Sequence, residues 1–112
     1  MKPLKAPPDD TIENNRIIVV SPFETPDVPL TLAFSKAGAL GVLDVGRDPQ
    51  KGIKAIAELP TNTSLDYGIR IPENLNLKPS QIPQQTTLVI LTPDEDLKSW
   101  SSQFPVLVQV TS

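Results

Sequence analysis

The sequence predicts an α/β fold in which five parallel β-strands alternate with helices. Four times an apolar, strand-like run is followed within a few residues by a proline, at the place where a helix would begin. Proline suits the first turn of a helix because its missing N–H would have no partner there, and Thr or Asp before it caps the free N–H groups. Strands joined through helices by right-handed crossovers lie parallel. Two architectures fit this pattern: the first part of a TIM-type barrel, and an open, flavodoxin-like doubly wound sheet.

The chain divides into a leader and one domain. Residues 1–15 are polar and rich in proline, so we expect a flexible leader there. The βα-repeat domain, a partial barrel in the first architecture, covers residues 16–112. Its first strand, residues 17–20, is apolar on both faces, as strands of a covered parallel sheet are.

The first helix is predicted over residues 27–37. The segment Thr25-Pro26-Asp27 opens it, and Gly38 ends it in the usual C-terminal position. The apolar residues expected to face the core recur at helical spacing, and they are Leu30, Ala33, Phe34 and Ala37.

The second strand is predicted over residues 39–45 and the second helix over residues 49–59. Asp48 precedes Pro49, which places an N-cap before a proline of the first turn. The residues of this helix expected to be buried are Ile53, Ile56, Ala57 and Leu59.

The remaining elements follow the same alternation. They are a strand at 65–71, a turn of helix at 73–77, a strand at 87–91, a helix at 93–102 and a strand at 106–110. We expect Trp100 to anchor the last helix in the core. The acidic residues 94–96 lie in the first turn of that helix, where the helix dipole favours negative charge.

Composition excludes several kinds of chemistry. The chain has no His and no Cys, so it contains no Ser-His-Asp triad, no thiol nucleophile and no Cys/His zinc site. The acidic residues do not follow a calcium-loop spacing, and we predict no metal site. The net charge of −3 and the scattered Lys and Arg argue against nucleic acid as a partner. No apolar run reaches the length of a bilayer span, so we expect a cytoplasmic protein without a membrane partner.

One long segment carries a family resemblance. Residues 17–46, IIVVSPFETPDVPLTLAFSKAGALGVLDVG, resemble the amino-terminal strand-helix-strand of nitronate monooxygenases, also called 2-nitropropane dioxygenases, which are FMN-dependent barrels. That family places a small residue, Pro and an apolar residue after its first strand, matched here by Ser21, Pro22 and Phe23. Its first helix leads into an Ala-Gly-x-Leu-Gly turn, matched by residues 37–41. The resemblance favours the barrel over the open sheet.

Further matches extend the resemblance toward the end of the chain. Residues 67–72, YGIRIP, look like the third strand of the family, and residues 108–112 look like its fifth. More narrowly, residues 37–52 resemble a nitronate monooxygenase-like region at the amino terminus of bacterial polyketide and polyunsaturated fatty acid synthases.

The resemblance implies a cofactor site but no catalytic residue. It places Ser21, Pro22 and Phe23 beside a flavin ring, and it places Arg70 where the family usually carries an Asn that contacts the flavin. The glycine-rich phosphate loops and the catalytic His of the family follow the fifth strand. We therefore expect FMN only in a full-length parent and none bound by this chain alone.

Each candidate site residue also has a purely structural interpretation. The segment 21–23 would serve as an ordinary strand-to-helix connection. Arg70 alternates with the strand residues around it, which points its guanidinium to the face opposite Tyr67 and Ile69. There it would hold a phosphate, a carboxylate or a flavin oxygen, or else pair with Asp44 or Asp48.

Three functions follow from these alternatives. The first is the amino-terminal nitronate monooxygenase-like region of a large polyketide or fatty acid synthase, inactive alone, whose open sheet edges bind the remainder of the polypeptide or another copy. The second is a free-standing α/β interaction or scaffold domain. The third is an FMN-dependent oxidoreductase active at this length.

Overall fold

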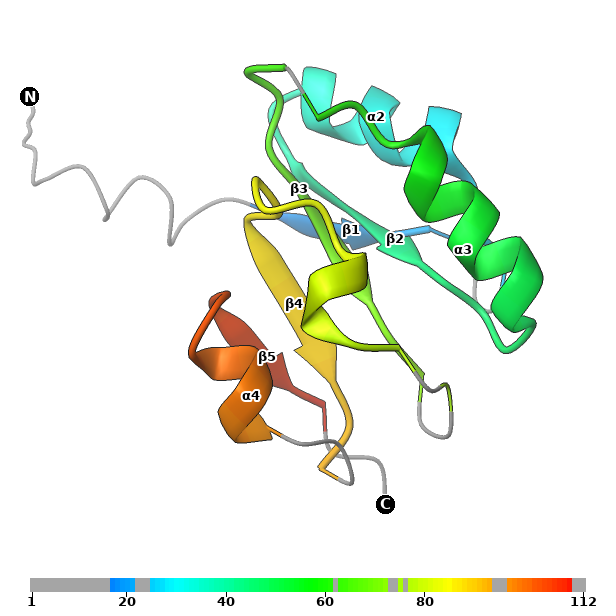
Figure 1. Ribbon diagram of the computed structural model, residues 1–112. Helices are drawn as coiled ribbons and strands as arrows, with labels where there is room; N and C mark the ends of the chain where they lie inside the picture. The colour runs from blue at the N-terminus through cyan, green and yellow to red at the C-terminus, as the bar shows by residue number, and fades with distance from the viewer. Residues whose placement is uncertain are drawn as a thin grey trace, which may run out of the picture.

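The protein folds around one parallel sheet. The computed structural model describes residues 17–21, 25–61, 63–72, 75, 77–93 and 97–109. The elements in chain order are β1 (Ile18–Val20), α2 (Val28–Lys36), β2 (Leu40–Asp44), α3 (Pro49–Glu58), β3 (Tyr67–Arg70), the 3₁₀ helix η1 (Pro79–Gln81), β4 (Leu88–Leu91), α4 (Leu97–Ser101) and β5 (Val106–Val108). The predicted α/β fold of five parallel strands alternating with helices is confirmed (Figure 1).

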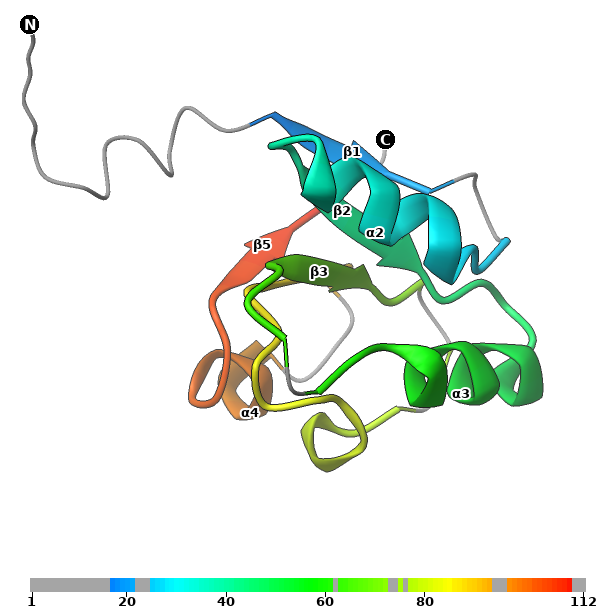
Figure 2. The ribbon, with the colours of Figure 1, turned by 90° about the horizontal axis from the view of Figure 1, so that it is seen from above.

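The strand order is that of a barrel wall. Each strand pairs with the strand before it in the chain, which gives the order β1-β2-β3-β4-β5. A flavodoxin-like sheet has the order 2-1-3-4-5, with a switch point near its middle. The sheet curls into a half-barrel with α2, α3 and α4 around its outer side (Figure 2).

The two faces of the sheet differ in what covers them. The outer face packs against the helices in the main core, which includes Leu43, Val45, Tyr67, Ile69, Ile71, Val89, Leu91, Ala55, Ile56 and Trp100. The inner face carries a smaller cluster made only of strand residues, namely Leu40, Val42 and Ile90 with Leu88 packed against them. Because paired residues of parallel strands share a face, the register places Arg70 on this inner face between Asp44 and Ile90.

The two long helices begin at aspartate caps. Asp48 caps α3 as predicted, since its Oδ1 accepts hydrogen bonds from the N–H groups of Gln50 and Lys51, at 3.0 and 3.4 Å. Of the segment Thr25-Pro26-Asp27 predicted to open α2, Asp27 lies at the start of the helix, whereas Thr25 and Pro26 precede it. Asp27 is the N-cap and accepts from the Leu30 N–H at 3.0 Å.

The predicted buried faces of these helices are partly wrong. In α2 the buried residues are Val28 and Thr31, and the predicted core residues Ala33 and Ala37 are exposed. In α3 the buried residues include Ala55 and Ile56, whereas Ile53 and Ala57, predicted to be buried, are exposed.

Glycine contacts explain these orientations. A Cβ on Gly41 would collide with the carbonyl oxygen of Thr31, and a Cβ on Gly52 would collide with Val45. Helix α2 therefore lies against the backbone of β2, which turns Thr31 toward the sheet, and α3 turns Gly52 toward Val45, the residue after β2.

Strands β3 and β4 are shorter than the predicted 65–71 and 87–91. A turn of 3₁₀ helix lies at Pro79–Gln81, and residues 73, 74 and 76 of the helical turn predicted at 73–77 lie outside the described residues. Helix α4 lies within the predicted 93–102, and residues 94–96 of that prediction lie outside the described residues. Trp100 is 2% exposed and its ring lies 6.3 Å from that of Phe104, which confirms its role as an anchor. Within the described part of the chain, no helix combines the length and the apolar character needed to cross a membrane.

Candidate functional site

The candidate site is a polar cluster where four strands end. Asp44 ends β2 and Arg70 ends β3, while Ser21 and Gln109 directly follow β1 and β5. In parallel α/β folds the carboxyl ends of the strands form the face on which ligand sites are built. The cluster therefore lies at the end of the half-barrel where ligand sites of such folds are built.

Arg70 lies at the centre of the cluster. Its Nη1 lies 3.0 Å from Oδ2 of Asp44, and its Nε donates a hydrogen bond to Oε1 of Gln109 at 2.7 Å. Arg70 is 7% exposed and Asp44 is fully buried. Of the two partners predicted for Arg70, the structure shows Asp44, because Asp44 and Arg70 are paired residues of adjacent strands.

Asp44 is held from two further directions. Its Oδ1 accepts the N–H of Gly46 at 3.0 Å, and its own backbone N–H donates to Oγ of Ser21 at 2.9 Å. Gly46 has a φ of 81°, a conformation that glycine adopts without strain. These contacts hold the Asp44 carboxylate in position beside the Arg70 guanidinium.

Ser21 joins β1 to the cluster. Besides accepting from Asp44, it donates its backbone N–H to the carbonyl oxygen of Val42 at 2.8 Å. The structure therefore brings Ser21 and Arg70 of the four predicted site residues to one place. Pro22 and Phe23 lie outside the described residues.

A pocket of about 720 Å³ opens in front of this cluster on the inner face. Its polar end carries Ser21, Arg70 and Gln109, and its walls are apolar: Ile18, Val20, Ile90, Leu107 and Val108. A volume of this order fits a small organic molecule, and a few polar groups within apolar walls are typical of ligand sites. Among the described residues that line the pocket, Arg70 is the charged one, and Asp44 balances its charge.

The role of Gln109 in the site was not predicted from the sequence. Gln109 stands in the final strand that the sequence predicted, and its position at a strand's carboxyl end was the available signal. That signal is weak, because the partner of a side chain from β5 depends on how far the sheet curls.

Thr92 is a further polar residue at this end of the sheet. It follows β4, and its buried Oγ1 has no hydrogen-bond partner among the described residues. Buried hydroxyl groups are usually paired, so this oxygen is an available hydrogen-bonding group near the polar end of the inner face.

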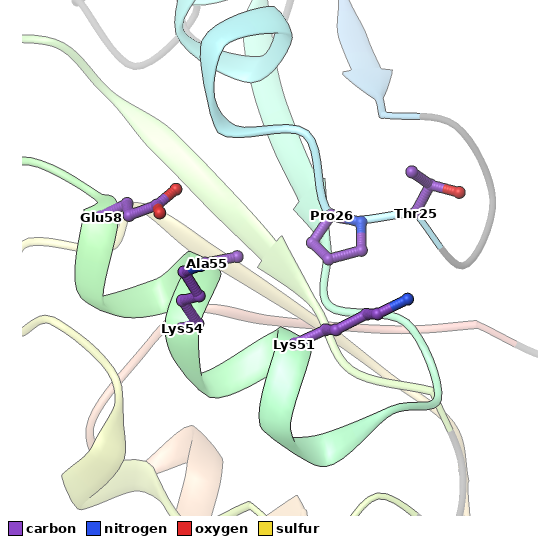
Figure 3. A pocket seen from close by; sticks show the side chains of 6 residues that line it. All are labelled: Thr25, Pro26, Lys51, Lys54, Ala55 and Glu58. Atoms are coloured by element: carbon purple, nitrogen blue, oxygen red, sulfur yellow. The ribbon is translucent and has the colours of Figure 1, made fainter.

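A smaller cavity of about 330 Å³ lies on the outer side, between α3 and the segment before α2 (Figure 3). Lys51 reaches from α3 toward Thr25 and Pro26. Ala55, which is buried, also lines the cavity. Lys51, Lys54 and Glu58 are exposed surface residues. None of the described polar residues that line this cavity is buried, so it is the weaker candidate.

The inner pocket is suited to binding a small molecule. Arg70, Gln109 and Ser21 supply hydrogen-bonding groups at one end of an apolar space. No group of three or more His, Cys, Asp or Glu side chains suited to a metal ion occurs in the part of the chain that the structure describes.

Comparison of the chain with protein-family models, with curated proteins and with solved structures found no match. The resemblance to nitronate monooxygenases therefore rests on the quoted residues alone and stays a prediction.

Proposed function

We propose that this chain is the amino-terminal nitronate monooxygenase-like region of a large polyketide or fatty acid synthase, and that it is not catalytic alone. The observation that carries the proposal is the consecutive order of five parallel strands, with helices on the outer side and a polar cluster at the carboxyl ends. A complete barrel of this type has eight strand-helix units. Five units supply part of the barrel wall and part of the face formed by the carboxyl ends of the strands.

The flavin part of the proposal concerns the parent protein. The inner pocket offers an apolar space for a ring system, with Arg70, Gln109 and Ser21 at its polar end. FMN also needs a phosphate site, and the positive charge at the pocket is already balanced by Asp44. We therefore expect FMN to bind the completed barrel, with Ser21 and Arg70 near its ring, and not to bind this chain alone.

The size of the native polypeptide tests the synthase assignment. An antibody raised against residues 16–112 should detect a band far larger than 12.2 kDa in cell extract. A band at 12.2 kDa would contradict the proposal and would favour a free-standing interaction domain.

Flavin binding tests the cofactor assignment. We expect FMN fluorescence to be unchanged when the purified chain is added, and we expect the purified parent to carry flavin absorbance. Arg70→Met in the parent should lower its flavin content, whereas Lys54→Met on the outer surface should leave it unchanged. A yellow, active 112-residue protein would instead support an oxidoreductase of this length.

The second candidate function is the free-standing interaction domain. The observation that favours it is the set of exposed apolar side chains on the two outermost strands, β1 and β5. Such strands bind other chains readily.

A further inference from the structure

The exposed apolar residues of this protein gather at the two open edges of the sheet. Within the described residues the exposed large apolar side chains are Ile17, Ile18, Val20, Leu107 and Val108 at the edges, with Ile53 on α3. Ile18, Val20, Leu107 and Val108 also line the inner pocket. One continuous surface therefore runs from the β1 edge across the inner face to the β5 edge.

Neither edge carries the features that usually prevent pairing. Residues 17–21 and 105–109 contain no charged side chain. Monomeric sheet proteins commonly place Lys, inward charges or outward-facing Pro on such strands. Pro105 does not serve this purpose, since its carbonyl accepts the Val89 N–H and so faces β4.

The backbone of both edges is oriented for a further strand. Ser21 donates its N–H to β2, and Gln109 donates its N–H to β4. Because N–H groups alternate in direction along a strand, those of Ile18 and Val20 point away from β2. By the same alternation, those of Val106 and Val108 point away from β4. Four amide groups are thus aimed outward.

We propose that a second copy of this chain covers both edges, with β5 of each copy pairing in parallel with β1 of the other. The two edges match, because each is a three-residue apolar strand in a parallel sheet. The curl of the sheet brings both edges of one half-barrel toward the same side, so two copies close a ring around a two-fold axis. Closure buries the inner pocket and leaves no open edge.

A dimer in which β1 pairs with β1, or β5 with β5, would leave one edge of each sheet unpaired. A β1–β1 or β5–β5 pair related by a two-fold axis across the sheet would be antiparallel and would leave the other edge open. The ring uses both edges at once. The inference concerns this chain at its present length and rests on the half-barrel part of the proposed function. In a longer polypeptide whose further strands complete the barrel, those strands would occupy the same two edges. The inference does not depend on the flavin or on the synthase.

The test is the molar mass of the purified chain by sedimentation equilibrium, compared among three variants. Val20→Lys places a charge on the β1 edge and Leu107→Lys places one on the β5 edge. Ile53→Lys is the matched control, because Ile53 on α3 is 47% exposed and Leu107 is 48% exposed. Fluorescence of Trp100, the one tryptophan of the chain, reports whether each variant is folded.

We expect the unmodified chain and the Ile53→Lys variant to have twice the monomer mass of 12.2 kDa. Each edge variant should weaken the dimer by at least about 100-fold, because closure would bury an unpaired charge. Loss of the dimer in only one edge variant would indicate a like-edge contact and overturn the ring. A monomer, or an open series of larger species, would also overturn it, and a monomer would favour closure by another part of a longer polypeptide.

If an edge variant does not fold, the same edges are tested with Ile18→Pro and Val108→Pro. Each removes only an outward N–H and leaves the hydrogen bonds to the neighbouring strand in place. A dimer that survives both proline changes would contradict the proposal. Neither result bears on the size of the native polypeptide or on flavin content, so failure of the ring and failure of the proposed function are separate results.

Discussion

Arg70 and Asp44 form a buried pair on the inner face of the sheet, at the end where a barrel would bind its ligand. The guanidinium also donates to Gln109, and the carboxylate accepts from Gly46, so both charges have several partners. Such a pair contributes little net stability, because desolvation offsets the attraction, but loss of one member leaves a buried charge. The pair therefore fixes the geometry of the site.

Removing one member of the pair should cost more than removing both. We expect Asp44→Val or Arg70→Met alone to lower the free energy of unfolding by about 3–5 kcal/mol, since each leaves the partner charge buried. The double variant should be more stable than either single variant. Urea unfolding of the four proteins gives the coupling energy, and additive effects would contradict the account.

Tyr67 makes the stability depend on pH in the alkaline range. Its hydroxyl donates to the carbonyl oxygen of Pro60 at 2.8 Å, and burial raises the pKa of Tyr67 above its usual 10.0. The folded state then keeps the proton to higher pH than the unfolded state does. The contribution is complete below pH 10.0 and is lost as the pH rises through the raised pKa of the folded state.

A comparison with Tyr67→Phe isolates this effect. The difference in unfolding free energy between the two proteins should be constant below about pH 10 and should fall above it. Lysines titrate in both proteins and cancel in the difference. A difference that stays constant up to the highest accessible pH would show that Tyr67 has no raised pKa.

The positions of single site residues were predictable from the sequence where strand alternation or strand pairing decides them. Strand alternation placed Arg70 on the inner face, and strand pairing supplied Asp44 as its partner. Gln109 was not predicted, because its contact with Arg70 joins strands that are not neighbours in the sheet. The curvature of the sheet decides that contact, and no short sequence pattern encodes it.

At the scale of elements, α2 is positioned by close backbone contact with β2 at Gly41, and α3 by close contact of Gly52 with Val45. Asp48 was predictable as a cap because the residue before a helix-starting proline has few alternatives. The buried faces of α2 and α3 were not, since Gly41 and Gly52 rotate the helices away from the orientation that their apolar stripes predict. Each glycine lacks a side chain at the point where a helix meets the sheet.

Gly41→Ala should disturb this contact. The added methyl group would meet the Thr31 carbonyl oxygen, so α2 must move outward, and we expect a loss of about 1–3 kcal/mol in unfolding free energy. Ala33→Ser, on the exposed face of α2, is the control and should change stability by less than about 0.5 kcal/mol. Equal stability of Gly41→Ala and the unmodified chain by urea unfolding would show that α2 does not depend on this close approach.

At the scale of the whole molecule, the sheet is half of a barrel wall. Its outer face is covered by helices and its inner face carries the buried cluster of Leu40, Val42 and Ile90, while both edges present apolar side chains to solvent. The sequence predicted the alternation of strands and helices because each unit has its own local signal. Whether such units form an open sheet or a barrel depends on strand order, and here the resemblance favoured the barrel, in agreement with the consecutive order.

Hydrogen exchange of the edge amides tests whether pairing between two copies closes the half-barrel at its edges. The four outward amides belong to Ile18, Val20, Val106 and Val108, and nuclear magnetic resonance follows each one. We expect these four amides to exchange slowly in the dimer and rapidly in the Leu107→Lys variant. Rapid exchange of all four in a stable dimer would contradict the account, because the two copies would then meet somewhere other than at the sheet edges.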